Sequence, residues 1–134
     1  MKKLILFIAI LVLAYYIFYN QFYVNGKFND FLAKYPQSKY AQIVDYILGW
    51  ICSLLGKTDS AIFRFQRVVE IYEVENLKPA ALYNIAQSYE EGKKEKKLAL
   101  KFYKLVYEKY PDTYYGDLGK KRYEYLILIG VRED

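Results

Sequence analysis

The sequence of 134 residues contains no histidine, one cysteine and only three prolines. Without histidine it cannot build a histidine-based catalytic pair or a Cys-x-x-Cys-His haem attachment site. No glycine-rich phosphate loop follows a strand, and no acidic residues have the spacing of a nucleophile with its partner or of a metal site. These absences predict a protein that is not an enzyme and that carries no metal or cofactor.

The single cysteine, Cys52, has no partner for an intrachain disulfide. It falls on the apolar stripe of a predicted helix, together with Leu48 and Leu55. A thiol in such a place is usually a small buried apolar group, and a reactive or metal-ligating role is the less favoured alternative. We therefore expect an inert, buried side chain.

Runs of alternating apolar and polar residues bounded by turn signals are also absent, so no β-strand is predicted. The chain has instead a junction that occurs twice. Residues 34–41 (Lys-Tyr-Pro-Gln-Ser-Lys-Tyr-Ala) return 75 residues later as residues 109–116 (Lys-Tyr-Pro-Asp-Thr-Tyr-Tyr-Gly). Proline ends one helix at each copy, and Ser38 and Thr113 are placed to cap the next. The fold is predicted to be all-α, with helices near 39–55, 59–74, 79–91, 95–110 and 113–129.

A shorter repeat lies between the two junctions. Three residues of the first unit recur 38 residues later in the second, so that Ala61, Phe65 and Val68 become Ala99, Tyr103 and Val106. Repeat periods of roughly 34 to 47 residues are typical of helical hairpins that stack into a solenoid. The spacing therefore predicts a short α-solenoid of about five helices.

These positions resemble the tetratricopeptide-repeat (TPR) superfamily over roughly residues 28–129. In that family small residues lie where the two helices of a repeat cross, glycine separates the helices, and proline follows the second helix. The matching residues are Leu48-Gly49, Gly56, Ala61, Phe65 and Val68 in one repeat and Ile85-Ala86, Tyr89, Gly92, Ala99, Tyr103, Val106 and Pro111 in the next. Asp45 departs from the pattern because a large apolar residue is usual there. The Tyr-Pro junction is most similar to envelope TPR proteins of bacteria, such as outer-membrane assembly lipoproteins and the cell-division coordinators of the Tol-Pal system.

The resemblance implies a concave groove lined by the first helix of each repeat. The positions that match this lining are Tyr46, Trp50, Tyr83, Gln87, Lys121 and Tyr125. Trp50 aligns with Tyr125 in the 75-residue register, so an aromatic ladder is expected along the groove. Trp and Tyr dominate many interfaces because they bury a large area with few rotatable bonds. The alternative is that these aromatics pack in the core of the solenoid or against a membrane.

The N-terminal segment is apolar from Leu4 to Tyr19, and residues 4–24 would measure about 31 Å as a helix, close to the ~30 Å core of a bilayer. Lysines precede it and tyrosines crowd its second half, which gives a predicted membrane interface of Lys2, Lys3, Tyr15, Tyr16, Tyr19 and Tyr23. We expect residues 1–26 to be a transmembrane anchor and residues 27–134 the TPR-like domain. The positive-inside bias predicts a single-pass protein of the cytoplasmic membrane, with its N-terminus in the cytoplasm and the TPR domain in the periplasm or outside.

Other interpretations of this segment are less favoured. A cleaved signal peptide requires small residues at a cleavage site, which the stretch from Tyr15 to Val24 lacks. A lipoprotein requires a cysteine directly after the apolar run. A helix buried in the core requires more surrounding surface than about 110 further residues supply.

The 75-residue register also places Phe28, Phe31, Leu32 and Tyr35 on positions of a second repeat helix. The anchor is therefore expected to lead directly into the solenoid, with a bend or break at Asn25-Gly26. Because no long linker separates the two, the solenoid is expected beside the bilayer, where membrane-bound partners are favoured.

Two further surfaces are candidates for contact. The net charge is +5, and lysines cluster at Lys93, Lys94, Lys96, Lys97, Lys101 and Lys104. This cluster is interpreted first as a solvated helix face and second as a contact for anionic headgroups or an acidic partner. The last helix is apolar nearly all round after Arg122, which favours a homo-oligomer or hetero-complex formed through it.

Two functions follow from the sequence. The first is a non-catalytic, membrane-anchored TPR protein that mediates protein–protein interaction as an accessory or structural subunit of a larger envelope complex. The second is a transient adaptor that binds peptides or proteins in envelope assembly, export or division. The expected partners are proteins, membrane-bound ones first, and the lipid bilayer, but not nucleic acid. A mitochondrial import receptor is a remote third because its solenoid faces the cytosol.

Overall fold

The structure is a computed structural model that describes residues 2–20 and 26–133. The chain divides into two compact units, Met1–Tyr35 and Pro36–Asp134. Every regular element in the described residues is a helix, as the sequence predicted. The predicted domain boundary after residue 26 remains a prediction.

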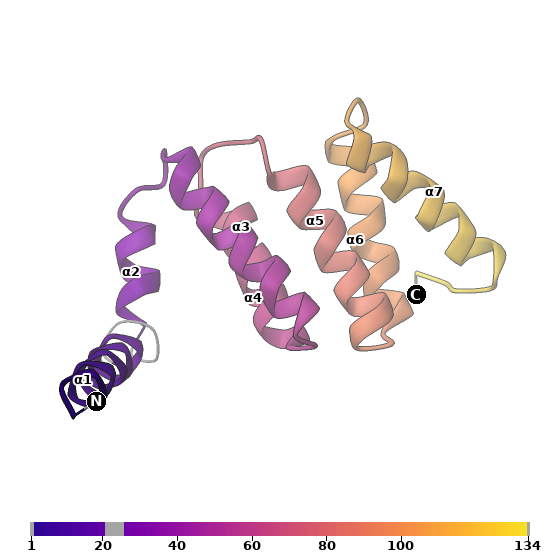
Figure 1. Cartoon of the computed structure of the whole chain (residues 1–134). Helices are drawn as coiled ribbons and strands as arrows, with labels where there is room; N and C mark the ends of the chain where they lie inside the picture. Colours follow the sequence, from indigo (N-terminus) through magenta and orange to yellow (C-terminus); the bar gives the residue numbers. More distant parts are fainter. Residues whose placement is uncertain (1, 21–25, 134) are drawn as a thin grey trace. The chain divides into compact units, whose positions relative to one another are not determined.

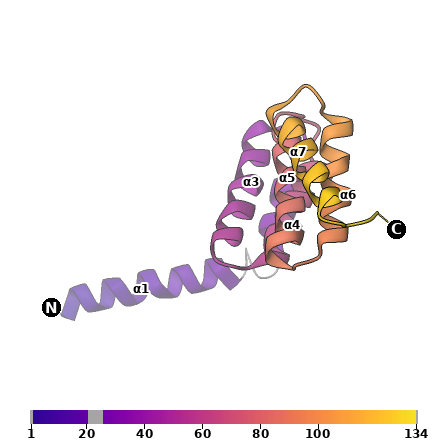
Figure 2. The ribbon, with the colours of Figure 1, turned by 90° about the vertical axis from the view of Figure 1, so that its right-hand side faces the viewer.

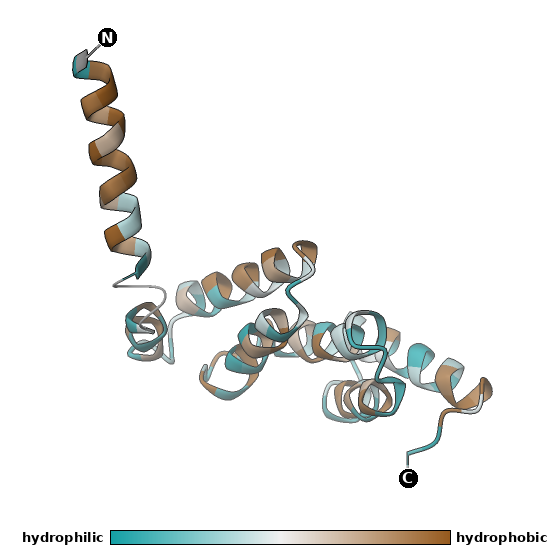
Figure 3. Ribbon diagram, turned by 90° about the horizontal axis from the view of Figure 1, so that it is seen from below, coloured by the Kyte–Doolittle hydropathy of each residue, from teal (hydrophilic) through white to brown (hydrophobic). Residues whose placement is uncertain are grey.

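The first unit contains α1 (Lys2–Phe18) and α2 (Lys27–Ala33). Figure 3 shows that α1 is hydrophobic along most of its length. Gly26 precedes α2 with φ of 74°, in the left-handed region that glycine adopts without strain. A break before the second helix was predicted at this glycine. Residues 21–25, which include Asn25 and Tyr23, lie outside the described part.

The expectation of a transmembrane anchor over residues 4–24 is overturned. In the part of the chain that the structure describes, no helix combines the length and the apolar character needed to cross a membrane. Helix α1 has 17 residues and ends at Phe18, so its length is about 26 Å against the ~30 Å of a bilayer core. The single-pass localisation, with the TPR domain in the periplasm or outside, depended on that span and is wrong. The predicted membrane interface stays a prediction; of its residues, Tyr15 and Tyr19 stack on each other with ring centroids 6.1 Å apart.

The second unit is an array of helical hairpins (Figure 1). Its elements are α3 (Lys39–Leu54), α4 (Thr58–Glu70), α5 (Lys78–Gln87), the π-helix η2 (Ser88–Gly92), α6 (Lys96–Lys109) and α7 (Tyr114–Leu128). Each helix packs on the next in the chain, and α7 also packs on α5. Figure 2 looks into this array with α7 nearest to the viewer. The observed bounds lie within four residues of those predicted, and η2 is the feature that the sequence did not predict.

The repeated junction behaves as predicted. The Ser38 hydroxyl accepts a hydrogen bond of 3.3 Å from the Ala41 backbone N–H at the start of α3. The Thr113 hydroxyl accepts one of 3.0 Å from the Gly116 N–H at the start of α7. Each cap satisfies one of the N–H groups that a helix start leaves without a partner, which stabilises the helix by about 1 kcal/mol.

The repeated apolar residues form the core. All six are buried: Ala61, Phe65, Val68, Ala99, Tyr103 and Val106. Cys52 is buried against the first group, as expected of an inert thiol. At the crossing of α3 and α4, a Cβ added to Gly49 would lie 2.8 Å from the Phe65 ring, which explains the small residue predicted there.

Asp45, which departs from the repeat pattern, is fully buried between α3 and α4. Its carboxylate accepts hydrogen bonds from Arg64 Nη1 at 2.7 Å, from Arg67 Nε at 3.0 Å and from Tyr72 Oη at 2.6 Å. Burial, followed by the hydrogen bond to this carboxylate, raises the pKa of the Tyr72 phenol. A polar cluster thus occupies this crossing, at a position where the sequence pattern predicted a large apolar residue.

Candidate functional site

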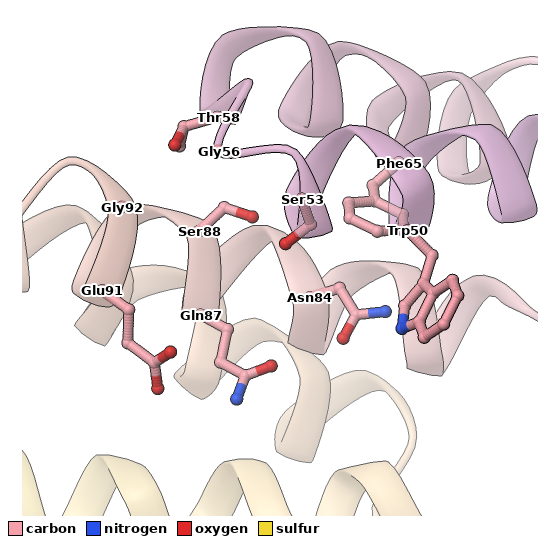
Figure 4. A pocket seen from close by; sticks show the side chains of 10 residues that line it. All are labelled: Trp50, Ser53, Gly56, Thr58, Phe65, Asn84, Gln87, Ser88, Glu91 and Gly92. Carbon is pink, nitrogen blue, oxygen red and sulfur yellow. The ribbon is translucent and has the colours of Figure 1, made fainter.

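A cleft of about 320 Å³ separates the C-terminal half of α3 from α5 and η2 (Figure 4). Its lining residues are Trp50, Ser53, Gly56, Thr58, Phe65, Asn84, Gln87, Ser88, Glu91 and Gly92. They come from the first hairpin and from the first part of the second, which are adjacent in the array. The cleft therefore depends on the way in which the two hairpins stack.

Most of the cleft wall is polar, with one large aromatic at its edge. Trp50 is 53% exposed and occupies one end, with the Asn84 amide directed toward it. The hydroxyls of Ser53 and Ser88 point toward each other from the two walls. Gln87 and Glu91 extend side by side at the other end. Such a surface combines hydrogen-bonding groups with an apolar ring, as protein-recognition sites often do.

The π-helix η2 forms one wall of this cleft. Its wide turn is closed by a hydrogen bond of 3.0 Å from the Lys93 N–H to the Ser88 carbonyl. π-turns insert one extra residue and frequently occur at functional sites. Here the turn separates two adjacent carboxylates, because Glu90 is buried in the helix array while Glu91 is exposed and lines the cleft.

Glu90 joins three helices. It accepts hydrogen bonds from Tyr103 Oη of α6 at 2.9 Å and from Arg122 Nε and Nη2 of α7 at 2.9 and 2.5 Å. Burial alone would raise the pKa of this carboxyl, but the hydrogen bonds from Arg122 and Tyr103 outweigh it and hold the pKa below the ordinary value of 4.5. The ion pair therefore fixes α7 against the cleft wall.

This pKa shift predicts an acid-sensitive contribution to stability. Because the pKa of Glu90 is lower in the folded than in the unfolded state, the contribution is present above about pH 4.5 and is lost as the pH falls through the folded value. We expect Glu90→Gln to lower the unfolding free energy near pH 7, and the difference from the wild type to shrink below pH 4. Urea titrations from pH 3 to pH 7 measure this difference in unfolding free energy.

The variant Glu108→Gln controls for the change in net charge, because Glu108 is exposed on α6. The unfolding free energy of Glu108→Gln is expected to stay close to that of the wild type from pH 3 to pH 7. A Glu90→Gln difference that is constant with pH would contradict the ion-pair explanation.

The structure brings together two of the predicted groove residues, Trp50 and Gln87, in the cleft. Tyr46 is half-buried, packs on the Phe65 ring at 5.6 Å and accepts a 3.0 Å hydrogen bond from Asn84 Nδ2. It is also hydrogen-bonded to Tyr115, and burial, the largest effect, raises its pKa. Tyr46, on α3, thus contacts three other helices beside the cleft and is not part of its lining.

The other predicted positions lie elsewhere. Tyr83 is half-buried, with its ring centroid 5.5 Å from that of Tyr103 and 5.7 Å from that of Tyr115. Lys121 forms an exposed ion pair of 2.7 Å with Asp117 on its own helix. The ring of Tyr125 lies 4.8 Å from the Arg122 guanidinium. None of these three residues lines the cleft, and the predicted groove with its aromatic ladder stays a prediction.

The sequence did not point to five polar residues of the cleft: Ser53, Thr58, Asn84, Ser88 and Glu91. For three of them the spacing was a signal, because Asn84, Ser88 and Glu91 lie on the same face of a helix as Gln87, at intervals of three or four residues. Among the described residues, no group of His, Cys, Asp or Glu is placed to hold a metal ion.

Two stacked hairpins followed by a capped fifth helix, with small residues at the crossings, define a helical-hairpin repeat protein. Residues 80–113 match the tetratricopeptide repeat, a span that runs from α5 through η2 and α6 to the cap residue Thr113. Residues 80–113 are thus similar to this repeat, and the all-helical fold agrees with it. No curated protein and no solved structure matches the chain.

Proposed function

We propose that this chain is a non-catalytic protein-interaction module that binds a segment of a partner protein in the cleft between α3 and α5. The observation that carries the proposal is the cleft itself, with the exposed Trp50 at its edge and a polar wall behind it. The TPR match agrees with it, because such repeats are interaction modules.

The size and chemistry of the cleft favour a peptide segment. Its volume of about 320 Å³ is at the small end of the range for ligand pockets, so it holds one or two side chains. An exposed tryptophan beside a concave surface is the residue type most enriched among binding hot spots. The polar wall supplies donors and acceptors for a partner backbone.

Site-specific cross-linking in living cells tests this proposal. With a photo-reactive amino acid in place of Gln87, we expect one predominant protein adduct that disappears when Trp50 is replaced by alanine. The same probe at Glu108, which is exposed on α6, serves as the matched control and is expected to give no such adduct. Equal adducts at both positions, or an adduct unaffected by Trp50→Ala, would refute docking at the cleft.

A second candidate function is that of a permanent accessory subunit of a larger complex, as opposed to a transient adaptor. Exposed apolar residues at the end of α7 favour it: Leu128 is 84% exposed, and Ile127 and Ile129 beside it are exposed as well. Clusters of this kind are often covered by another subunit. In the cross-linking experiment, a probe at Leu128 that gives an adduct independent of Trp50 supports this function, and no adduct at Leu128 contradicts it.

A further inference from the structure

We infer that the cleft recognises a basic side chain, lysine or arginine, of the bound segment, and that Glu91 is its counter-charge. This inference rests on the proposed function, since it names the chemistry of the segment that the same cleft would bind.

The charge of the cleft is that of one carboxylate. Of the described residues that line it, only Glu91 is ionisable at neutral pH, and Glu91 is exposed. No ion pair to Glu91 is formed within the described part of the chain. The acidic residues nearby are already neutralised, because Glu90 is paired with Arg122 and Asp59 with Lys93 at 2.7 Å.

The polar groups also suit a cation. Glu91 extends beside Gln87 (Figure 4), whose side-chain amide carries one oxygen that can accept a hydrogen bond. An ammonium has three donors and a guanidinium five, and neither accepts a hydrogen bond. The cleft wall can accept hydrogen bonds from these donors, because Ser53 and Ser88 add hydroxyl oxygens.

Other occupants fit less well. An acidic side chain would meet the Glu91 carboxylate with no cation in the lining to offset the repulsion. A fully apolar segment would remove water from the carboxylate and from the amides of Asn84 and Gln87 without replacing their hydrogen bonds. A basic side chain avoids both costs.

Trp50 defines the neighbouring position of the segment. It lies at the end of the cleft opposite Glu91 (Figure 4), and we assign the two residues to different side chains of the bound segment. An apolar or aromatic residue adjacent to the basic one would pack on the exposed indole ring. The expected motif is therefore a Lys or Arg next to an apolar residue in an extended segment.

A positional-scanning library of nonapeptides, incubated with the full chain, tests the inference directly. We expect the selected peptides to be enriched in Lys or Arg at one position and in apolar residues beside it. Glu91→Gln is expected to weaken binding of the best peptide by at least about tenfold, since a hydrogen bond to a charged group is lost. Glu91→Lys is expected to shift the preference at that position to Asp or Glu. The matched control, Glu108→Gln, changes the net charge outside the cleft and should leave the preference unaltered.

The outcomes separate the inference from the function on which it rests. If the wild type selects no peptide, or binds peptides that Trp50→Ala does not weaken, the proposed docking function fails and the inference fails with it. If binding depends on Trp50 but shows no basic preference, or is unchanged in Glu91→Gln, the cleft still docks a segment and only the inference is overturned. Because Glu91 is exposed, the unfolding midpoint of each variant should match that of the wild type.

Discussion

Replacement of Asp45 by asparagine is expected to lower the unfolding free energy by about 3 to 5 kcal/mol, which for a small domain is a large part of its stability. The side chain keeps its size, so the effect comes from the loss of charge. Asp45 is fully buried and its carboxylate is shared by Arg64 and Arg67. The variant removes the negative charge of this cluster, and removing one charge of a buried ion pair is costly.

Urea denaturation measures this effect as a lower midpoint at an unchanged slope. The matched control is Asp59→Asn, which removes the carboxylate of an ion pair with Lys93 that has the same 2.7 Å distance. The Asp59 side chain is 84% exposed, so its pair is screened by water and its loss should cost at most about 1 kcal/mol. Equal losses for the two variants would contradict the role given to burial.

A triple variant tests the physical cause. It is made in a Tyr72→Phe background, which removes the buried hydroxyl that donates to Asp45. Changing Asp45 to leucine while changing Arg64 and Arg67 to methionine then removes all three charges and fills the space with apolar side chains. Buried ion clusters replaced in this way are often as stable as the original or more so. We expect stability close to that of the wild type. A triple variant as unstable as Asp45→Asn would show that shape, and not charge, holds this crossing together.

The sequence identified Asp45 as a departure from the repeat pattern but did not predict its partners. Arg64 and Arg67 lie 19 and 22 residues away, on α4. Which face of α4 meets α3 is decided by the packing of the two helices. The buried apolar residues were predictable because Phe65 and Tyr103 occupy equivalent positions of a repeat, and one contact type recurs at each. A polar cluster that occurs once has no second copy to reveal it.

The expectation of a membrane span was wrong because an apolar run indicates which residues avoid water but does not give the bounds of a helix. Helix α1 runs from Lys2 to Phe18, shorter than the predicted span. At the candidate site, the sequence pointed to Trp50 and Gln87 but not to the polar residues between them, because the stacking of the two hairpins decides which helix faces meet. The π-helix η2 lies within the second hairpin, and three of its residues, Ser88, Glu91 and Gly92, line the cleft.

Replacement of Gly116 by alanine is expected to destabilise the protein by about 2 to 3 kcal/mol, even though alanine is the better helix former by about 1 kcal/mol. In the repeated junction Gly116 takes the place of Ala41, so the sequence suggests that the two residues are exchangeable. The structure separates them: a Cβ added to Gly116 would lie 1.9 Å from the Tyr110 carbonyl oxygen, a backbone atom that cannot rotate away. The start of α7 would have to move, and with it Tyr115, which contacts Tyr83.

The reciprocal change supplies the control for this close approach. Ala41→Gly places at the first junction the residue that the second one has, and it should cost only about 1 kcal/mol through the lower helix propensity of glycine. Thermal unfolding of both variants, with near-ultraviolet circular dichroism to follow the tyrosine environment, measures the asymmetry. If Gly116→Ala were as stable as the wild type, the carbonyl of Tyr110 and the start of α7 would not be in the contact described, and the two junctions would be equivalent in structure as well as in sequence.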